Sequence, residues 1–181
     1  AIDGAYQHVL GQISAVLSQY AVDYVKWDHN RDLIDAGSAH DDGRPGVSAQ
    51  TRAFYRLLDE MRQRHPAVEF ESCSSGGSRI DLEVMQRAER AWVSDNNDPH
   101  SRQRMLWWTG QLLPLERMGS HVAAGRSHQT NRVHDIDFRA ATALFGHFGI
   151  EWDLLQATDE ELAKLAFWVE FYKQRRGLLH S

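Results

Sequence analysis

The chain has 181 residues and a formal net charge of −5, and this acidic balance argues against a nucleic-acid-binding surface. No stretch approaches the roughly 20 apolar residues that cross a bilayer, and no secretory signal is evident at the start. The single cysteine, Cys73, excludes an internal disulfide and is typical of a reducing compartment. We therefore expect a cytoplasmic protein that binds neither nucleic acid nor membranes.

Secondary structure in the first half alternates between helix and strand. Apolar residues recur every three or four positions over 4–20, which predicts a helix, and an apolar run over 22–25 predicts a strand. After a polar loop, Ser48 is the predicted N-cap of a helix that Pro66 ends. Residues 67–73 are the second expected strand.

The second half continues the alternation. Further strands are expected at residues 91–94, 118–123 and 148–154. Helices are expected at residues 81–87, 99–113, 137–145 and 158–176. Pro99 suits the start of one of these helices, and Thr158 with Glu161 forms a capping box for the last. Such alternation indicates a parallel sheet covered by helices.

Polar and glycine-rich segments follow the predicted strands, which is where a (β/α)8 barrel builds its active site. A doubly wound sheet follows a similar rule, but no GxGxxG or GxxxxGK[ST] motif supports nucleotide binding. A complete barrel needs eight strands and roughly 250 residues. We therefore predict an α/β fold, part of a (β/α)8 TIM barrel, in which residues 1–181 supply strands 4 to 8 with their helices as a single fragment.

The first strand ends in polar residues. Lys26, Asp28 and Asn30 are spaced by two, so they are expected on one face, with Trp27 on the other against a helix. A polar row at the end of a buried strand is typical of a functional site. The alternative is an edge strand whose polar end has no function.

Two carboxylates, Asp28 and Asp95, lie where different strands meet their loops, and glycoside hydrolysis needs such a pair. Lys26 would keep Asp28 ionised as a nucleophile. Asp95 would have to carry a proton near neutral pH, which apolar surroundings such as Trp92 would favour. The alternative is that Asp95 and Asp98 only cap the following helix.

Three motifs are long enough to compare with known families: Lys26-Trp27-Asp28-His29-Asn30-Arg31, Glu71-Ser72-Cys73-Ser74-Ser75-Gly76-Gly77-Ser78-Arg79 and Ser94-Asp95-Asn96-Asn97-Asp98. They resemble the nucleophile motif, the next signature and the acid/base segment of glycoside hydrolase family 36 (GH36), the α-galactosidases. Shorter matches follow in the same order at residues 119–122, 128–132, 143–146 and 148–154. The resemblance covers essentially the whole chain.

The resemblance implies retaining hydrolysis of terminal α-linked galactose, as in melibiose or raffinose. Asp28 matches the nucleophile and Asp95 the acid/base. Lys26 and Asn30 match positions that bind galactose hydroxyls, while Cys73 and Gly76 match positions that line the sugar pocket. No metal or organic cofactor is expected. An α-N-acetylgalactosaminidase is the nearest competing activity, because residues 73–75 decide the fit around the sugar's 2-position.

The chain departs from the family pattern in two ways. His29 and Ser78 stand where methionine and glycine are frequent, and Ser78 matters only if its φ must be positive. The family's first barrel strands, its N-terminal β-domain and its C-terminal β-domain have no counterpart here. We expect the isolated chain to be inactive and to associate through exposed barrel edges with a partner or as a homo-oligomer. The alternative is a non-catalytic sugar-binding or assembly module.

Other candidate features have structural explanations. His121 and His128 lack a suitably spaced third metal ligand, so we expect His121 inside the barrel and His128 on a loop. Trp107 and Trp108 could stack on a sugar, although at least one is expected in the core. The aromatic residues of the last helix are also expected in the core: Phe167, Trp168, Phe171 and Tyr172.

Overall fold

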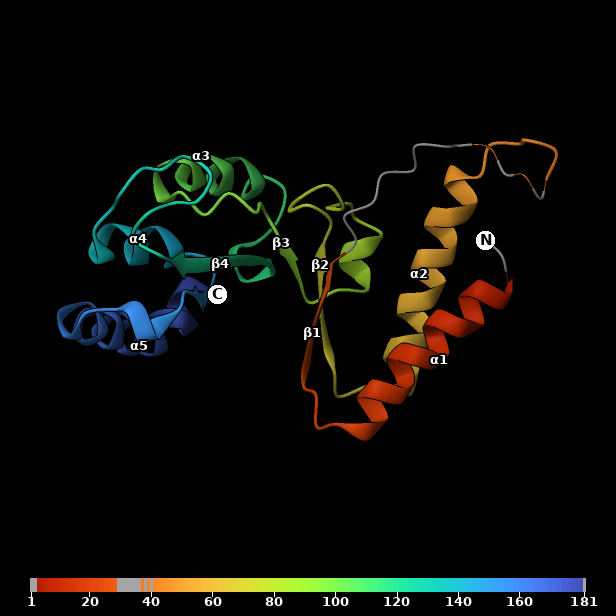
Figure 1. Cartoon of the computed structure of the whole chain (residues 1–181), viewed down its shortest axis with the longest axis horizontal. Helices are drawn as coiled ribbons and strands as arrows, with labels where there is room; N and C mark the ends of the chain where they lie inside the picture. The colour runs from red at the N-terminus through yellow and green to blue at the C-terminus, as the bar shows by residue number, and fades with distance from the viewer. Residues whose placement is uncertain (1–2, 29–36, 38, 40, 181) are drawn as a thin grey trace. The chain divides into compact units, whose positions relative to one another are not determined.

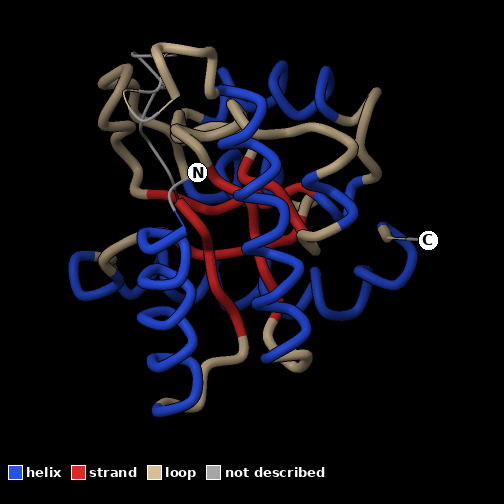
Figure 2. Tube along the Cα trace, turned by 90° about the vertical axis from the view of Figure 1, so that its right-hand side faces the viewer, coloured by secondary structure: helices blue, strands red, loops and turns tan. Residues whose placement is uncertain are grey.

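The computed structural model describes residues 3–28, 37, 39 and 41–180 (Figure 1). The chain forms two compact units, unit 1 being Ala1–Ser74 with Arg79–Glu89 and unit 2 being Ser75–Ser78 with Arg90–Ser181. In both units helices alternate with strands along the chain, as Figure 2 shows in blue and red. Within the described part of the chain, no helix is both long enough and apolar enough to cross a membrane.

Unit 1 contains one pair of parallel strands. Its elements are α1 (Asp3–Gln19), β1 (Tyr24–Asp28), α2 (Val47–Arg64), β2 (Glu69–Cys73) and the 3-10 turn η1 (Val84–Gln86). Lys26 of β1 lies opposite Glu71 of β2, and Asp28 lies opposite Cys73. The register therefore brings polar residues of both strands to the same end of the pair.

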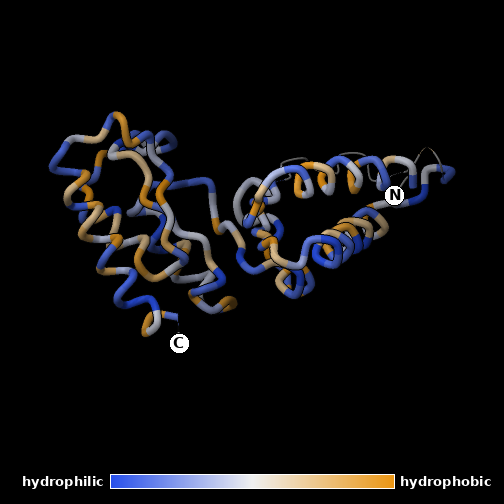
Figure 3. Tube along the Cα trace, turned by 90° about the horizontal axis from the view of Figure 1, so that it is seen from below, coloured by the Kyte–Doolittle hydropathy of each residue, from blue (hydrophilic) through white to orange (hydrophobic). Residues whose placement is uncertain are grey.

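The two helices of unit 1 lie side by side, and both mix hydrophobic and hydrophilic residues along their length (Figure 3). Their buried side chains recur at helical spacing: Tyr6, Leu10 and Leu17 on α1, and Leu57, Leu58 and Met61 on α2. The Tyr6 hydroxyl donates a hydrogen bond to Glu60 Oε1 at 2.6 Å. Amphipathic periodicity thus gives this unit its helix-to-helix core.

Unit 2 contains three parallel strands, β3, β4 and β5, with β4 in the middle. Its elements are β3 (Arg90–Trp92), α3 (Pro99–Thr109), η2 (Leu115–Arg117), β4 (Met118–Ala123), α4 (Ile136–Ala143), β5 (His147–Glu151), η3 (Leu154–Gln156) and α5 (Asp159–Leu179). One apolar cluster joins β4 to two helices and consists of Val122, Ile136, Ala140, Ala143 and Leu165.

Two buried arginines connect helices to strand ends in unit 2. Arg102 of α3 donates to the carbonyls of Ser94 and Gly119, at 2.7 and 3.1 Å. Arg139 of α4 donates to the Ala123 carbonyl at 2.7 Å and to Glu161 Oε1 at 2.9 Å. The bonds to Ser94 and Ala123 satisfy carbonyls where β3 and β4 lead into their loops, so these loops start from fixed positions. The bond to Gly119 ties α3 to the beginning of β4.

All five predicted strands are present, but several element ends differ from the prediction. The helix expected at 81–87 is only the 3-10 turn Val84–Gln86, and α3 ends at Thr109 rather than near 113. Gly46, not Ser48, precedes α2, because the Ser48 hydroxyl lies inside the first turn and accepts from Arg52. The capping box of Thr158 and Glu161 is confirmed.

The predicted burial of several aromatic residues is wrong. Trp107 and Trp108 are 67% and 63% exposed, because the inward face of α3 starts from Arg102 and continues at positions three and four residues on. On α5, Tyr172 is buried as expected, whereas Phe167 is 62% exposed. Phe167 therefore lies on the outward side of its helix.

Candidate active site

The predicted division of the first strand into two faces is confirmed. The Trp27 ring contacts Phe54 of α2, with ring centroids 6.0 Å apart, while Lys26 and Asp28 alternate to the other face. The strand itself is not buried as expected: Lys26 and Asp28 are exposed. Among the described strands of unit 1, β1 pairs only with β2, so it is an edge strand there. Asn30 lies outside the described residues.

Lys26 and Asp28 lie beside two buried residues of β2. Glu71 is 2% exposed, its Oε1 lies 4.0 Å from Lys26 Nζ, and its other oxygen accepts from the Tyr24 hydroxyl. Cys73, opposite Asp28, is 1% exposed. Unit 1 therefore brings Lys26, Asp28 and Cys73 together, with Glu71 as a buried carboxylate that holds the lysine.

In unit 2, Gly76 lies against the segment that carries Asp95. Gly76 has a φ of +79°, and a Cβ on it would lie 2.6 Å from Ser94 Cα and 2.9 Å from the Asp95 backbone nitrogen. A side chain at position 76 would therefore force either residues 94–95 or the backbone of residue 76 to move. The described residues with positive φ are Asp42, Gly43, Ser75, Gly76 and Asn131. Ser78 is not one of them, so a serine there carries no backbone strain.

Asp95 is exposed, and its carboxylate makes a specific hydrogen bond. The indole Nε1–H of Trp92 donates to Asp95 Oδ1 at 2.9 Å. The sequence led us to expect Trp92 to enclose Asp95 in apolar surroundings, and in that respect the expectation is wrong. Trp92 presents its only polar group to the carboxylate, which fixes the direction of that oxygen.

Asp98, rather than Asp95, caps the following helix. One oxygen of Asp98 accepts from the backbone N–H of His100 at 2.9 Å and of Ser101 at 3.2 Å. The alternative in which both aspartates serve only as caps is therefore wrong for Asp95.

The two histidines lie in different surroundings. His121 Nδ1 is 3.0 Å from Glu151 Oε2, and its ring centroid is 4.3 Å from that of Trp92. His128 is exposed on the loop that follows β4. Among the described residues, no group of three or more histidine, cysteine, aspartate or glutamate side chains is placed to hold a metal ion.

Comparison with known proteins identifies the family. A family model described as Melibiase matches residues 1–181. The chain belongs to the melibiase family. The GH36 resemblance is thereby confirmed, since the similar solved structures are GH36 alpha-galactosidases.

This melibiase chain is 46% identical over 180 residues to an alpha-galactosidase of Escherichia coli, covering 99% of the chain and 25% of that protein. A crystal structure of a GH36 alpha-galactosidase AgaA variant from Geobacillus stearothermophilus with 1-deoxygalactonojirimycin has a TM-score of 0.91 at 35% identity, covering 97% of this chain and 25% of that one. Another AgaA variant, in complex with raffinose, has a TM-score of 0.92 at 34% identity, with the same coverage. The chain thus spans about a quarter of the length of these relatives.

These structures confirm the predicted fold. A match over 97% of the chain to a GH36 enzyme corresponds to part of the family's barrel, with parallel strands alternating with helices.

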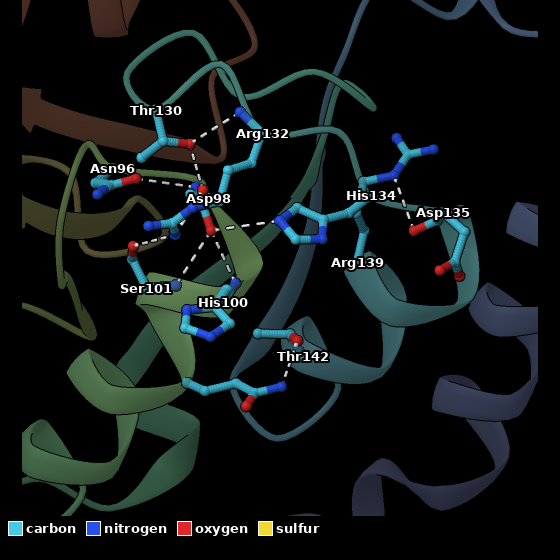
Figure 4. A network of polar contacts seen from close by, with 11 residues as sticks. Asn96, Asp98, His100, Ser101, Thr130, Arg132, His134, Asp135, Arg139 and Thr142 are labelled. Atoms are coloured by element: carbon cyan, nitrogen blue, oxygen red, sulfur yellow. Dashed lines mark hydrogen bonds and ion pairs between the residues drawn. The ribbon is translucent and has the colours of Figure 1, made fainter.

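Asp98 is the centre of a polar network in the melibiase chain (Figure 4). It is fully buried, and its second oxygen accepts from the Thr130 hydroxyl and from Arg132 Nη1, the latter at 3.2 Å. His134 Nε2 lies 3.6 Å from its first oxygen. Burial alone would raise the pKa of Asp98, but the hydrogen bonds from Thr130 and Ser101 and the charge of Arg132 outweigh it and lower the pKa. The network joins the loop before α4 to the start of α3.

We expect Asp98→Asn to destabilise the chain by about 1–3 kcal/mol at neutral pH, because the asparagine keeps the cap but loses the charge-assisted bonds. The pKa of Asp98 is lower in the folded state, so the unfolded chain binds more protons in acid and the stabilisation is lost as pH falls below about 3.9. The difference in unfolding free energy between parent and variant should therefore shrink over that range in urea titrations. Asp135→Asn, at the exposed cap of α4, is the control and should cost much less. A pH-independent difference would contradict the assignment.

The sequence did not reveal three features near Asp28 and Asp95. These are the buried Glu71 beside Lys26, the buried Arg102 and the hydrogen bond that Trp92 donates. Glu71 could have been noticed, because a spacing of two places it on the same strand face as Cys73. Arg102 gave no signal, since an arginine on a helix is ordinarily a surface residue.

Proposed function

We propose that this chain contributes both catalytic carboxylates of a retaining α-galactosidase that acts on terminal α-linked galactose. The observation that carries the proposal is the placement of Lys26 and Asp28 on one face of β1, opposite Glu71 and Cys73, in a chain 46% identical to an alpha-galactosidase. The exposed Asp95, which does not cap α3, supplies the second carboxylate.

In the proposed reaction Asp28 attacks the anomeric carbon as the bond to the leaving group breaks, and Asp95 donates a proton to the departing oxygen. Asp95 then takes a proton from water, which attacks the same carbon and releases galactose and free Asp28. Lys26, together with Asn30, binds galactose hydroxyls. Cys73 and Gly76 line the sugar pocket.

Galactosides of the raffinose type are the proposed substrates, and the AgaA variant in complex with raffinose supports this class. An α-N-acetylgalactosaminidase remains the nearest competing activity, decided by residues 73–75. A non-catalytic sugar-binding or assembly module is the alternative of a different class. It is disfavoured because Lys26, Asp28 and Asp95 are all present.

The chain alone should not hydrolyse galactosides, because its relatives are about four times its length and it offers an edge strand where a complete barrel would pair. Through that edge we propose association with a partner chain or with other copies of itself.

The test is hydrolysis of 4-nitrophenyl α-galactoside by the chain and by the chain extended with the flanking sequence of its gene, hereafter the extended chain. We expect turnover of the extended chain in the ordinary enzyme range and none of the chain alone. The N-acetylgalactosaminide analogue distinguishes the competing activity. An extended chain that binds galactose without hydrolysing the glycoside would support the non-catalytic module instead, and rapid turnover by the chain alone would contradict the need for further strands.

A further inference from the structure

The hydrogen bond from Trp92 to Asp95 joins a buried group to an exposed one. Trp92 is 1% exposed, although its Nε1–H reaches Asp95 Oδ1 at 2.9 Å, whereas Asp95 is open to solvent. An indole N–H only donates, so this contact is possible only when Oδ1 acts as an acceptor. Because the unprotonated oxygen of a carboxyl group is the better acceptor, this contact favours a proton on the other oxygen, Oδ2.

The Trp92 ring is itself held by charged and aromatic neighbours. The Arg102 guanidinium carbon lies 4.6 Å from the ring centroid, and Arg102 is fixed in turn by its bonds to two backbone carbonyls. The His121 ring packs on the same indole at 4.3 Å between centroids. His121 is oriented by Glu151 of the neighbouring strand.

Gly149 gives the His121 ring its room. A Cβ on Gly149 would lie 2.4 Å from His121 Cδ2, so a larger residue on β5 would displace the imidazole from its place beside Trp92. Strands β3, β4 and β5 thus each contribute to the position of one indole N–H.

We propose that Trp92 is the positioning residue of the acid/base carboxyl, an inference that rests on the proposed function. Its indole donates to Oδ1 of Asp95, favours the catalytic proton on Oδ2 and directs that oxygen toward the glycosidic oxygen. A proton on Oδ2 assists departure of a poor leaving group, whereas an activated aryl group departs with little assistance. Loss of the indole N–H therefore affects poor leaving groups selectively.

The experiment compares kcat/KM of the extended chain and its variants on melibiose and on 2,4-dinitrophenyl α-galactoside. The kcat/KM value reports the first bond-breaking step for both substrates. Trp92→Phe keeps an aromatic ring and removes the donor. We expect kcat/KM on melibiose to fall by about tenfold or more, the scale of one lost hydrogen bond to a charged group, with little change on the activated substrate.

A second variant carries 3-benzothienylalanine at position 92, which keeps the shape of the indole and replaces its N–H with sulfur. It should show the same selectivity, and it provides the measurement if phenylalanine leaves a cavity that prevents folding. Trp168→Phe is the matched control, because Trp168 Nε1 donates to Asp137 Oδ1 at 2.8 Å between α5 and α4 of the same unit. It should affect both substrates equally, if at all.

Equal losses on both substrates for the two position-92 variants would overturn the inference. Asp95→Asn separates this failure from that of the proposed function. If Asp95→Asn discriminates between the substrates and the position-92 variants do not, only the role of Trp92 falls. If Asp95→Asn does not discriminate, or the extended chain lacks galactosidase activity, the proposed function and the inference fall together.

Discussion

Replacement of Asp28 by alanine in the extended chain is expected to reduce turnover of α-galactosides by about 10⁴-fold or more, as for the loss of other catalytic nucleophiles. The carboxylate lies on the exposed face of β1, two residues from Lys26 and opposite Cys73. In the proposed mechanism no covalent galactosyl intermediate can form without this carboxylate.

Azide should restore part of the lost turnover, because a small anion fits the space that the carboxylate leaves. Azide would attack the anomeric carbon as the leaving group departs, giving a galactosyl azide of inverted configuration. The product is identified by NMR. Asp23→Ala, an exposed aspartate just before the same strand, is the matched control and should leave turnover unchanged. Undiminished activity of Asp28→Ala, without any azide product, would refute the nucleophile assignment.

Replacement of Asp95 by asparagine is expected to lower kcat/KM on melibiose by about 10²–10⁴-fold, the usual contribution of a general acid. The amide oxygen can still accept the Trp92 N–H, so the side chain keeps its direction but loses the acidic proton that a general acid donates. An activated aryl galactoside should retain most of its kcat/KM, because its leaving group needs little protonation.

Asp137→Asn serves as the control for Asp95→Asn, since Asp137 lies on α4 and also accepts an indole N–H. It should show no dependence on the leaving group. If Asp95→Asn impaired both substrates to the same degree, the carboxylate would be acting in binding or folding, and the acid/base assignment would be wrong.

The fold was largely predictable because its local signals agree with one another. The strand 118–123 was predicted to the residue, and the other strands lie within a few residues of the prediction. The predicted helix starts at Pro99 and Thr158, which carry proline or side-chain capping signals, were correct. The predicted start of α2, which has no side-chain cap, was wrong by two residues. Burial on α3 was missed because one buried arginine, not the tryptophans, sets its inward face.

The candidate site was predictable where it follows from strand alternation and less so where it depends on tertiary register. The shared face of Lys26 and Asp28 follows from a spacing of two. The pairing of Lys26 with Glu71 depends on how β1 and β2 align, which no local pattern specifies. Trp92 was recognised as a neighbour of Asp95, but a sequence does not show whether an indole presents its face or its N–H.

The tryptophans differ in solvent exposure, so their fluorescence should differ in its sensitivity to a dissolved quencher. Of its six tryptophans, Trp107 and Trp108 face solvent, while Trp92 is enclosed beside the carboxylate. A dissolved quencher such as iodide would extinguish the surface pair and spare the enclosed fluorophore. The remaining emission would come from Trp92 together with the partly buried Trp27, Trp152 and Trp168, and its change on addition of galactose would test the proposed sugar site without any added label.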